Sequence, residues 1–173
     1  MVRSEQARNK ALIRFIVYNG IVAALYIVLT YFLAPISYGP LQARISEAMT
    51  VFPIFSFNMI PGLTIGCLVS NLINPDNLGP VDIIGGTLAT LIAGIFSRII
   101  GKKNMWLGII PPIVANGIIV GGYLPFLLFD TVTWQEVLLT MLSVAAGEAV
   151  VLVVIGLPLV AVIGKTGLKN KLP

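Results

Sequence analysis

Hydrophobic residues in this chain form long runs, and most charged residues lie in short segments between them. Three stretches carry no charge, residues 15–34, 48–75 and 104–129. A helix needs about 20 apolar residues to cross the hydrocarbon core of a bilayer. The pattern therefore predicts an all-α integral membrane protein, with a single transmembrane domain over residues 1–173.

Prolines, glycines and charges divide these runs into six predicted helices. We place the helices at residues 12–33, 43–57, 61–74, 81–100, 105–128 and 134–163. The second and third contain only ~15 residues, or ~22 Å of α-helix, so they form either two full crossings or a re-entrant hairpin. Pro53 predicts a kink in the second helix, and Pro61 suits the start of the third.

The distribution of charge predicts the orientation of the helices. With both termini inside, ten of the eleven Lys and Arg residues are cytoplasmic, as the positive-inside rule expects. Four acids then fall outside: Asp76, Asp82, Asp130 and Glu136. We therefore expect an N-in, C-in, multi-pass protein. Its net charge of +4 needs no nucleic-acid partner, because the basic residues would lie beside anionic lipid head groups.

Composition excludes several other classes of protein. The chain is 57% hydrophobic and only 10% charged, whereas soluble domains average about 25% charged residues. It has no histidine and one cysteine, Cys67, which rules out an intrachain disulfide and a Cys/His zinc site. We expect no metal, no cofactor and no catalytic residue. The first apolar run is longer than the usual signal-peptide core, so we expect a retained helix.

Three ionisable side chains are expected within the membrane: Arg44, Glu47 and Glu148. Charges at this depth are costly, so they normally face a cavity or a partner. Arg44 and Glu47 lie three positions apart on one predicted helix face, where they can pair. Counting along the helices places Asn71 near the height of Glu47, and Asn116 level with Glu148.

These polar residues suggest a pocket that opens to the outside. Tyr123 follows Asn116 by seven positions, which puts both on one helix face. The candidate substrate-binding residues are Tyr38, Gln42, Arg44, Glu47, Asn71, Asn116, Tyr123 and Glu148. One net negative charge favours a planar cation rich in N–H donors, because carboxylates accept paired donors well. A purely structural role in helix-end pairing and interhelical hydrogen bonds remains the alternative.

The first helix carries a different pattern. Gly20, Ala23 and Ala24 are small residues at i, i+3 and i+4, which permits close helix contact. They serve either internal packing or docking to another membrane subunit. The sequence contains no P-loop, so active transport would draw on partner subunits or an ion gradient. An autonomous carrier is disfavoured because no internal repeat is visible, and a metal-dependent membrane enzyme because histidine is lacking.

Several segments point to one family. The segment "YGPLQARISEAMTVFPIF" resembles the signature of the QueT family, the substrate-binding S component of an energy-coupling factor (ECF) transporter. "PGLTIGCLVSNLINP", "DIIGGTLATLIAG" and "PPIVANGIIVGGYLP" resemble its third, fourth and fifth helical segments. The similarity spans about residues 10–165. It implies the six-helix S-component bundle, in a bacterial cytoplasmic membrane.

The resemblance also implies a ligand and partners. The ligand would be a queuosine precursor, typically the deazaguanine-type base 7-aminomethyl-7-deazaguanine, with queuine or the nucleoside as alternatives. Uptake would require a transmembrane coupling subunit and two cytoplasmic ATPase subunits. The coupling subunit would meet the first helix at Gly20, Ala23 and Ala24, and the S component would topple in the membrane to carry its ligand inward. An S component for another vitamin, such as thiamine or biotin, is the main rival.

Overall fold

The computed structural model describes residues 2–37, 43–74, 78–168 and 172, with side chains from residue 5 onward. Every regular element within these ranges is helical, which confirms the predicted class. In chain order the elements are α1 (Val2–Phe32), α2 (Ala34–Ser37), η1 (Ile45–Val51), α3 (Phe52–Phe55), η2 (Phe57–Met59), α4 (Ile60–Leu72), α5 (Pro80–Lys103), η3 (Leu107–Ile109), α6 (Ile110–Ala115), η4 (Asn116–Val120), α7 (Gly121–Tyr123), α8 (Pro125–Leu128), α9 (Trp134–Val151), η5 (Leu152–Gly156) and α10 (Leu157–Lys165).

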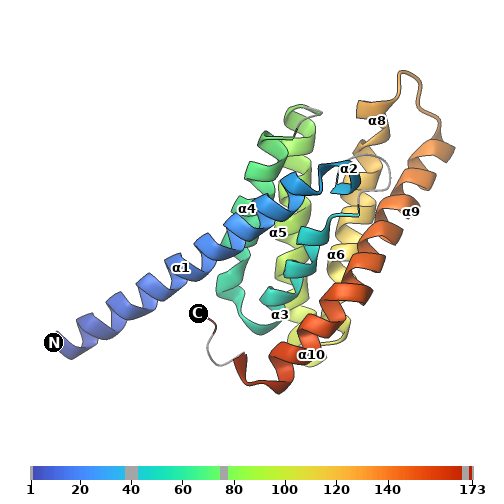
Figure 1. The fold of residues 1–173 in the computed structure, drawn as a ribbon. Coiled ribbons are helices and arrows are strands. Elements are labelled where there is room, and N and C mark those ends of the chain that lie inside the picture. Colours follow the sequence, from blue (N-terminus) through green and yellow to red (C-terminus); the bar gives the residue numbers. More distant parts are fainter. Residues whose placement is uncertain (1, 38–42, 75–77, 169–171, 173) are drawn as a thin grey trace.

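These elements join into six helical segments that run alternately up and down the bundle (Figure 1). Four are long and apolar enough to cross a bilayer: Glu5–Phe32, Pro80–Lys103, Leu107–Leu128 and Trp134–Lys165. Two are shorter: Ile45–Phe55 and Phe57–Leu72. The predicted six helices are thus confirmed, and the chain is a multi-pass membrane protein. The start of α1 and the end of α10 lie toward the same end of the bundle, as an N-in, C-in topology requires (Figure 1).

The second segment is short in residues but reaches deep into the bundle. Its first part, η1, is a 3₁₀-helix, which rises about 2.0 Å per residue instead of about 1.5 Å. Pro53 stands in the first turn of α3, where the helix changes type, instead of kinking one continuous α-helix. Arg98 Nη1 donates to Ile54 O over 2.7 Å, close to the last turn of α5. This depth favours two full crossings over a re-entrant hairpin.

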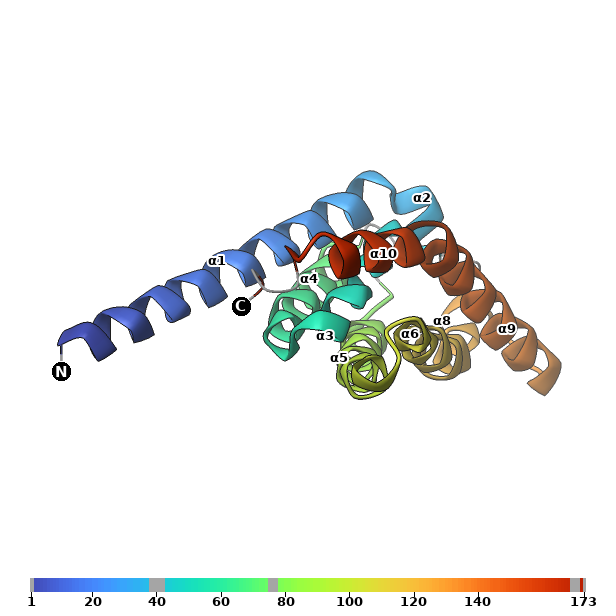
Figure 2. The same ribbon diagram turned by 90° about the horizontal axis from the view of Figure 1, so that it is seen from below.

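Helix α1 begins ten residues earlier than predicted, because the helix continues through the polar N-terminal residues. Its N-terminal half projects beyond the bundle, and its C-terminal half packs against α4 (Figures 1 and 2). Asn19 accepts from Gly62 N at 2.6 Å and donates to Asn58 O at 2.8 Å. At Gly66 an added Cβ would lie 2.8 Å from Tyr26 Cβ. Small residues on α4 therefore let α1 approach closely.

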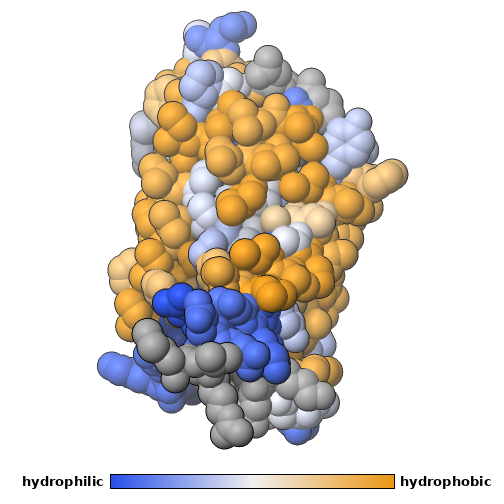
Figure 3. Space-filling view, turned by 90° about the vertical axis from the view of Figure 1, so that its left-hand side faces the viewer, coloured by the Kyte–Doolittle hydropathy of each residue, from blue (hydrophilic) through white to orange (hydrophobic). Residues whose placement is uncertain are grey.

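The outer surface suits a lipid environment. Large apolar side chains are exposed along α1, α5, α6 and α9, among them Ile16, Phe96, Val114 and Leu142. Figure 3 shows a broad hydrophobic surface, with hydrophilic residues gathered toward its upper and lower ends. Hydrophobic helix faces turned outward are expected where the solvent is hydrocarbon.

Candidate functional site

Glu47 lies where η1 meets α1 and α5 in the interior, and its side chain is 2% exposed. The hydroxyl of Tyr26 donates to Glu47 Oε1, and Thr90 Oγ1 lies 3.4 Å from the same oxygen. Glu47 Oε2 is buried with no hydrogen-bond partner among the described residues. One carboxylate oxygen is thus held by the protein, and the other is available to a further donor.

Glu148 occupies the middle of the last segment, on α9, and is also 2% exposed. Its carboxyl group faces the side-chain amide of Asn116 and lies within electrostatic reach of Glu47 and Arg44. Neither Glu148 Oε1 nor Asn116 Nδ2 completes a well-oriented hydrogen bond within the described part of the chain. Asn116 opens the π-helical η4, and π-helical turns occur often at functional sites.

Asp82 forms a third buried acidic position, in the first turn of α5 at 1% exposure. Tyr123 donates its hydroxyl to Asp82 Oδ1 at 2.8 Å, and Asn71 Nδ2 donates to Asp82 O at 3.3 Å. Gly85 and Gly86 make room for both groups. A Cβ added at Gly85 would lie 2.6 Å from Tyr123 Cε1, and a Cβ added at Gly86 would lie 2.6 Å from Asn71 Nδ2.

Arg44 approaches these acids from outside η1. Its backbone is extended, with φ −79° and ψ 104°, and its Nε donates to Ser37 O over 3.0 Å. Arg44 is the N-cap residue and so precedes the helix on which it was predicted, while Glu47 lies in the first turn of that helix. The guanidinium still lies within electrostatic reach of Asp82 and Glu47.

Together these side chains form what we term the interior polar cluster. Its members are Tyr26, Arg44, Glu47, Asn71, Asp82, Thr90, Asn116, Tyr123 and Glu148. One arginine and three carboxylates give a formal charge of −2. The sequence predicted −1, because Asp82 was placed in an outer segment although it is buried. Such a cluster can accept several N–H donors and neutralise a cation.

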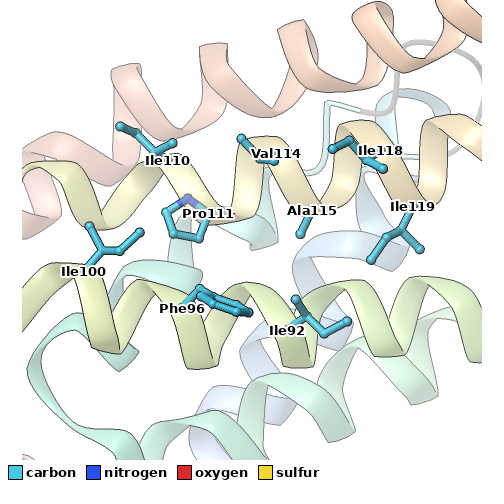
Figure 4. A pocket seen from close by; sticks show the side chains of 9 residues that line it. All are labelled: Ile92, Phe96, Ile100, Ile110, Pro111, Val114, Ala115, Ile118 and Ile119. Carbon is cyan, nitrogen blue, oxygen red and sulfur yellow. The ribbon is translucent and has the colours of Figure 1, made fainter.

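A groove between α5 and α6 has a different character (Figure 4). It has a volume of 370 Å³, and isoleucine, valine, alanine, phenylalanine and proline side chains line it. Phe96 and Val114 are about half exposed beside it. Such a lining has no side-chain donor or acceptor to orient a polar ligand, so we assign this groove to the lipid-facing surface and not to the site.

Comparison with known proteins identifies the family. Residues 16–165 match the QueT transporter family. The chain belongs to this family. One relative, "Queuosine precursor transporter QueT" of Lactococcus lactis subsp. cremoris (strain MG1363), is 44% identical over 79 residues. That alignment covers 44% of the chain and 45% of the relative. No solved structure matches the chain. The resemblance to QueT noted in the sequence is confirmed, and the family is one of transporters, not of enzymes.

In this QueT family member, six of the eight predicted substrate-binding residues belong to the interior polar cluster: Arg44, Glu47, Asn71, Asn116, Tyr123 and Glu148. Tyr38 and Gln42 lie outside the described residues. Asn116 and Tyr123, predicted on one face, have partners on different helices, α9 and α5. The π-helical turn between them changes the residue spacing that the prediction assumed.

Sequence reasoning missed Asp82, Tyr26 and Thr90 as members of the cluster. A signal for Tyr26 was present, because Asn19, Tyr26 and Thr30 are spaced seven and four positions apart. That spacing puts them on one face of a helix, and all three are buried. Asp82 was overlooked because it opens a helix, where a carboxylate is usually solvated.

The three predicted docking residues of the QueT family member differ in their exposure in the structure. Ala23 is 9% exposed, and an added Cβ at Gly66 of α4 would lie 3.2 Å from Ala23 Cα. Gly20 and Ala24 are exposed, and nothing lies within 4 Å of a Cβ added at Gly20. Ala23 therefore packs inside the bundle, whereas a docking role for Gly20 and Ala24 stays a prediction.

Proposed function

We propose that this chain is the substrate-binding subunit of an energy-coupling factor importer, with high affinity for the queuosine precursor 7-aminomethyl-7-deazaguanine, in a bacterial cytoplasmic membrane. Membership of the QueT transporter family supports transport, and the name of the Lactococcus lactis relative supports the substrate. The observation that carries the proposal is a pair of buried carboxylates with open oxygens, Glu47 Oε2 and Glu148 Oε1.

Buried carboxylates without full hydrogen bonding are costly in an apolar bundle. A cationic ligand with N–H donors offsets that cost. The proposed base has two matching features, a guanine-like edge with neighbouring N–H donors and an ammonium group. One carboxylate accepts from the edge through its open oxygen, since an ionised carboxylate is a strong acceptor for N–H donors. The other faces the ammonium group.

Neutral groups of the cluster complete the recognition of the base. Asn116 Nδ2 and Asn71 Oδ1 are buried without a hydrogen-bond partner among the described residues. They offer one donor and one acceptor, which suit a ring carbonyl and an N–H group. The ring of Tyr123 provides a face for stacking. Because Glu47 and Glu148 are each 2% exposed, access for the base requires helix ends to separate.

Energy for uptake comes, in this proposal, from a transmembrane coupling subunit and two cytoplasmic ATPase subunits. The coupling subunit docks on the exposed small residues of α1, Gly20 and Ala24, since small residues permit close helix contact within a membrane. Toppling of the bundle against that subunit then carries the base inward.

Calorimetry on the purified protein in detergent tests the choice of substrate. We expect tight binding of 7-aminomethyl-7-deazaguanine, weaker binding of guanine, which lacks the ammonium group, and no measurable binding of adenine. A site built around hydrogen bonds rejects a ligand that leaves its buried groups unpaired. Mass spectrometry of the copurified small molecule provides an independent check. Equal affinity for adenine and the aminomethyl base contradicts the proposal.

Uptake assays test the docking of partners. Ala24→Leu should leave binding intact and abolish uptake in cells that carry the coupling subunit and ATPases. The matched variant Ala23→Leu should instead lower the melting temperature, because Ala23 packs against α4. Uptake by proteoliposomes that contain this chain alone would identify an autonomous carrier and reject the ATP-driven scheme.

A further inference from the structure

A second pocket lies at the other end of the bundle, where α5 ends, and has a volume of 460 Å³. α3, α5, the segment that follows α5, and α10 surround it. Arg98 and Lys102 of α5 supply its charge, and Phe55 and Met105 belong to its apolar wall. We term it the basic pocket. Its lining residues Lys102 and Gly164 lie in the last turns of α5 and α10, and these two helix ends lie at the same end of the bundle (Figure 1). Asp82 of the interior polar cluster lies in the first turn of α5, at the other end of that helix.

The charge of the basic pocket is not balanced by its own lining. Among the residues that the structure describes, every lining residue is apolar, a glycine or cationic, so none of them brings a carboxylate to Arg98 and Lys102. Arg98 Nη1 donates to Ile54 O, in the last turn of α3, where helix carbonyls lack helical partners. Arg98 Nε is buried with no hydrogen-bond partner in the described ranges. The guanidinium therefore retains donors for an anion.

We infer that the basic pocket binds the phosphate of an anionic phospholipid from the leaflet beside it. Arginine binds phosphate through a planar fork of N–H donors, and Lys102 adds a second positive charge. The apolar wall at Phe55 and Met105 suits the start of an acyl chain. Basic pockets between transmembrane helices at the cytoplasmic side are known to hold such head groups. This inference is independent of the transported substrate.

Native mass spectrometry of the full chain in a neutral detergent tests the inference. The probes are phosphatidylglycerol, phosphatidylcholine with the same acyl chains, and inorganic phosphate. We expect one phosphatidylglycerol bound in preference to the other two. Lys102→Gln should weaken that binding about tenfold, the loss of one charge-assisted hydrogen bond. Lys103→Gln is the matched control, because it removes the same charge one residue outside the pocket and should change the affinity little.

A second variant fills the pocket without altering its charge. An added Cβ at Gly164 would lie 3.3 Å from Met105 Sδ, so Gly164→Leu should block the lipid yet preserve the fold, as its melting temperature will check. Any one of three results overturns the inference. Phosphatidylcholine binds as tightly as phosphatidylglycerol, Lys103→Gln weakens phosphatidylglycerol binding as much as Lys102→Gln does, or Gly164→Leu binds phosphatidylglycerol as tightly as the unchanged protein. Inorganic phosphate bound as tightly as the lipid assigns the site to a soluble anion and rejects a lipid. None of these results depends on whether the base binds.

Discussion

The interior polar cluster and the basic pocket hold charge in opposite ways. In the cluster, three carboxylates are 1–2% exposed, and the members of the cluster come from all six helical segments. In the basic pocket, Arg98 and Lys102 occupy the last two turns of one helix, beside an open cavity. The cluster is formally negative, and the pocket is positive.

The two regions differ in the free-energy cost of placing charged side chains there. A cation near a helix C-terminus is favoured by the helix dipole and stays close to water, so the basic pocket costs little to build. Carboxylates in the bundle interior are costly unless their oxygens are satisfied. The protein satisfies Glu47 Oε1 with Tyr26 and Asp82 Oδ1 with Tyr123. The proposed function gives Glu47 Oε2 and Glu148 Oε1, which the described residues leave open, a donor from the ligand.

The largest expected effect comes from Glu148→Gln, which removes an open carboxylate. Affinity for the aminomethyl base should fall about 100-fold, the usual cost of breaking a buried charged contact. The melting temperature of the ligand-free protein should rise, because a costly buried charge is gone. Calorimetry and thermal unfolding measure both quantities.

Glu136→Gln is the matched control, since it changes a partly exposed carboxylate in the first turn of the same helix. A glutamine there can preserve the capping box with Thr133, so affinity should not change. A lower melting temperature with unchanged affinity in Glu148→Gln would assign that carboxylate to structure.

The next largest effect is expected from a substitution that tests how tightly the cluster is packed. Gly85→Ala places a Cβ against the ring of Tyr123, so the free energy of unfolding should fall by about 2 kcal/mol, as in other overpacked interiors. Gly122→Ala is the control, because nothing lies within 4 Å of its added Cβ. Thermal unfolding in detergent compares the two. Equal stability would mean that Tyr123 is free to move.

A smaller loss of stability is expected from a substitution in the basic pocket. Arg98→Gln loses the hydrogen bond to Ile54 O, which should reduce the free energy of unfolding by about 1 kcal/mol. Binding of the base should not change, because Arg98 lies outside the cluster. Arg98→Lys should recover part of the stability. A loss of base affinity in Arg98→Gln would show that the two regions are coupled.

Salt concentration should have the smallest effect of all on the affinity of the interior polar cluster for the base. Between 50 mM and 500 mM salt, base affinity should vary by less than about threefold, because buried charges are poorly screened. Phosphatidylglycerol binding at the open basic pocket should weaken more over the same range. Titrations at the two salt concentrations make the comparison. A steeper salt dependence for the base than for the lipid would reverse the assignment of buried and exposed charge.

Residue spacing predicted much of the candidate site. Glu47 and Glu148 stood out because carboxylates are rare within apolar runs, and depth counting brought Asn71 and Asn116 to their level. Asp82 could not be found that way, because its burial depends on Tyr123 reaching across Gly85 from another helix. Ala23 and Ala24 looked equivalent in sequence, but only Ala23 faces α4.

The hydrophobic and charge patterns along the chain were enough to predict the number of helices and the charge difference between the two ends. Bilayer thickness and the cost of buried charge act on each segment separately, so they leave a local pattern. The packing of distant segments sets which oxygens of Glu47, Asp82 and Glu148 accept hydrogen bonds within the described residues and which remain open. Those contacts join residues far apart in the chain, and 3₁₀- and π-helical turns alter the spacing from which they would be counted.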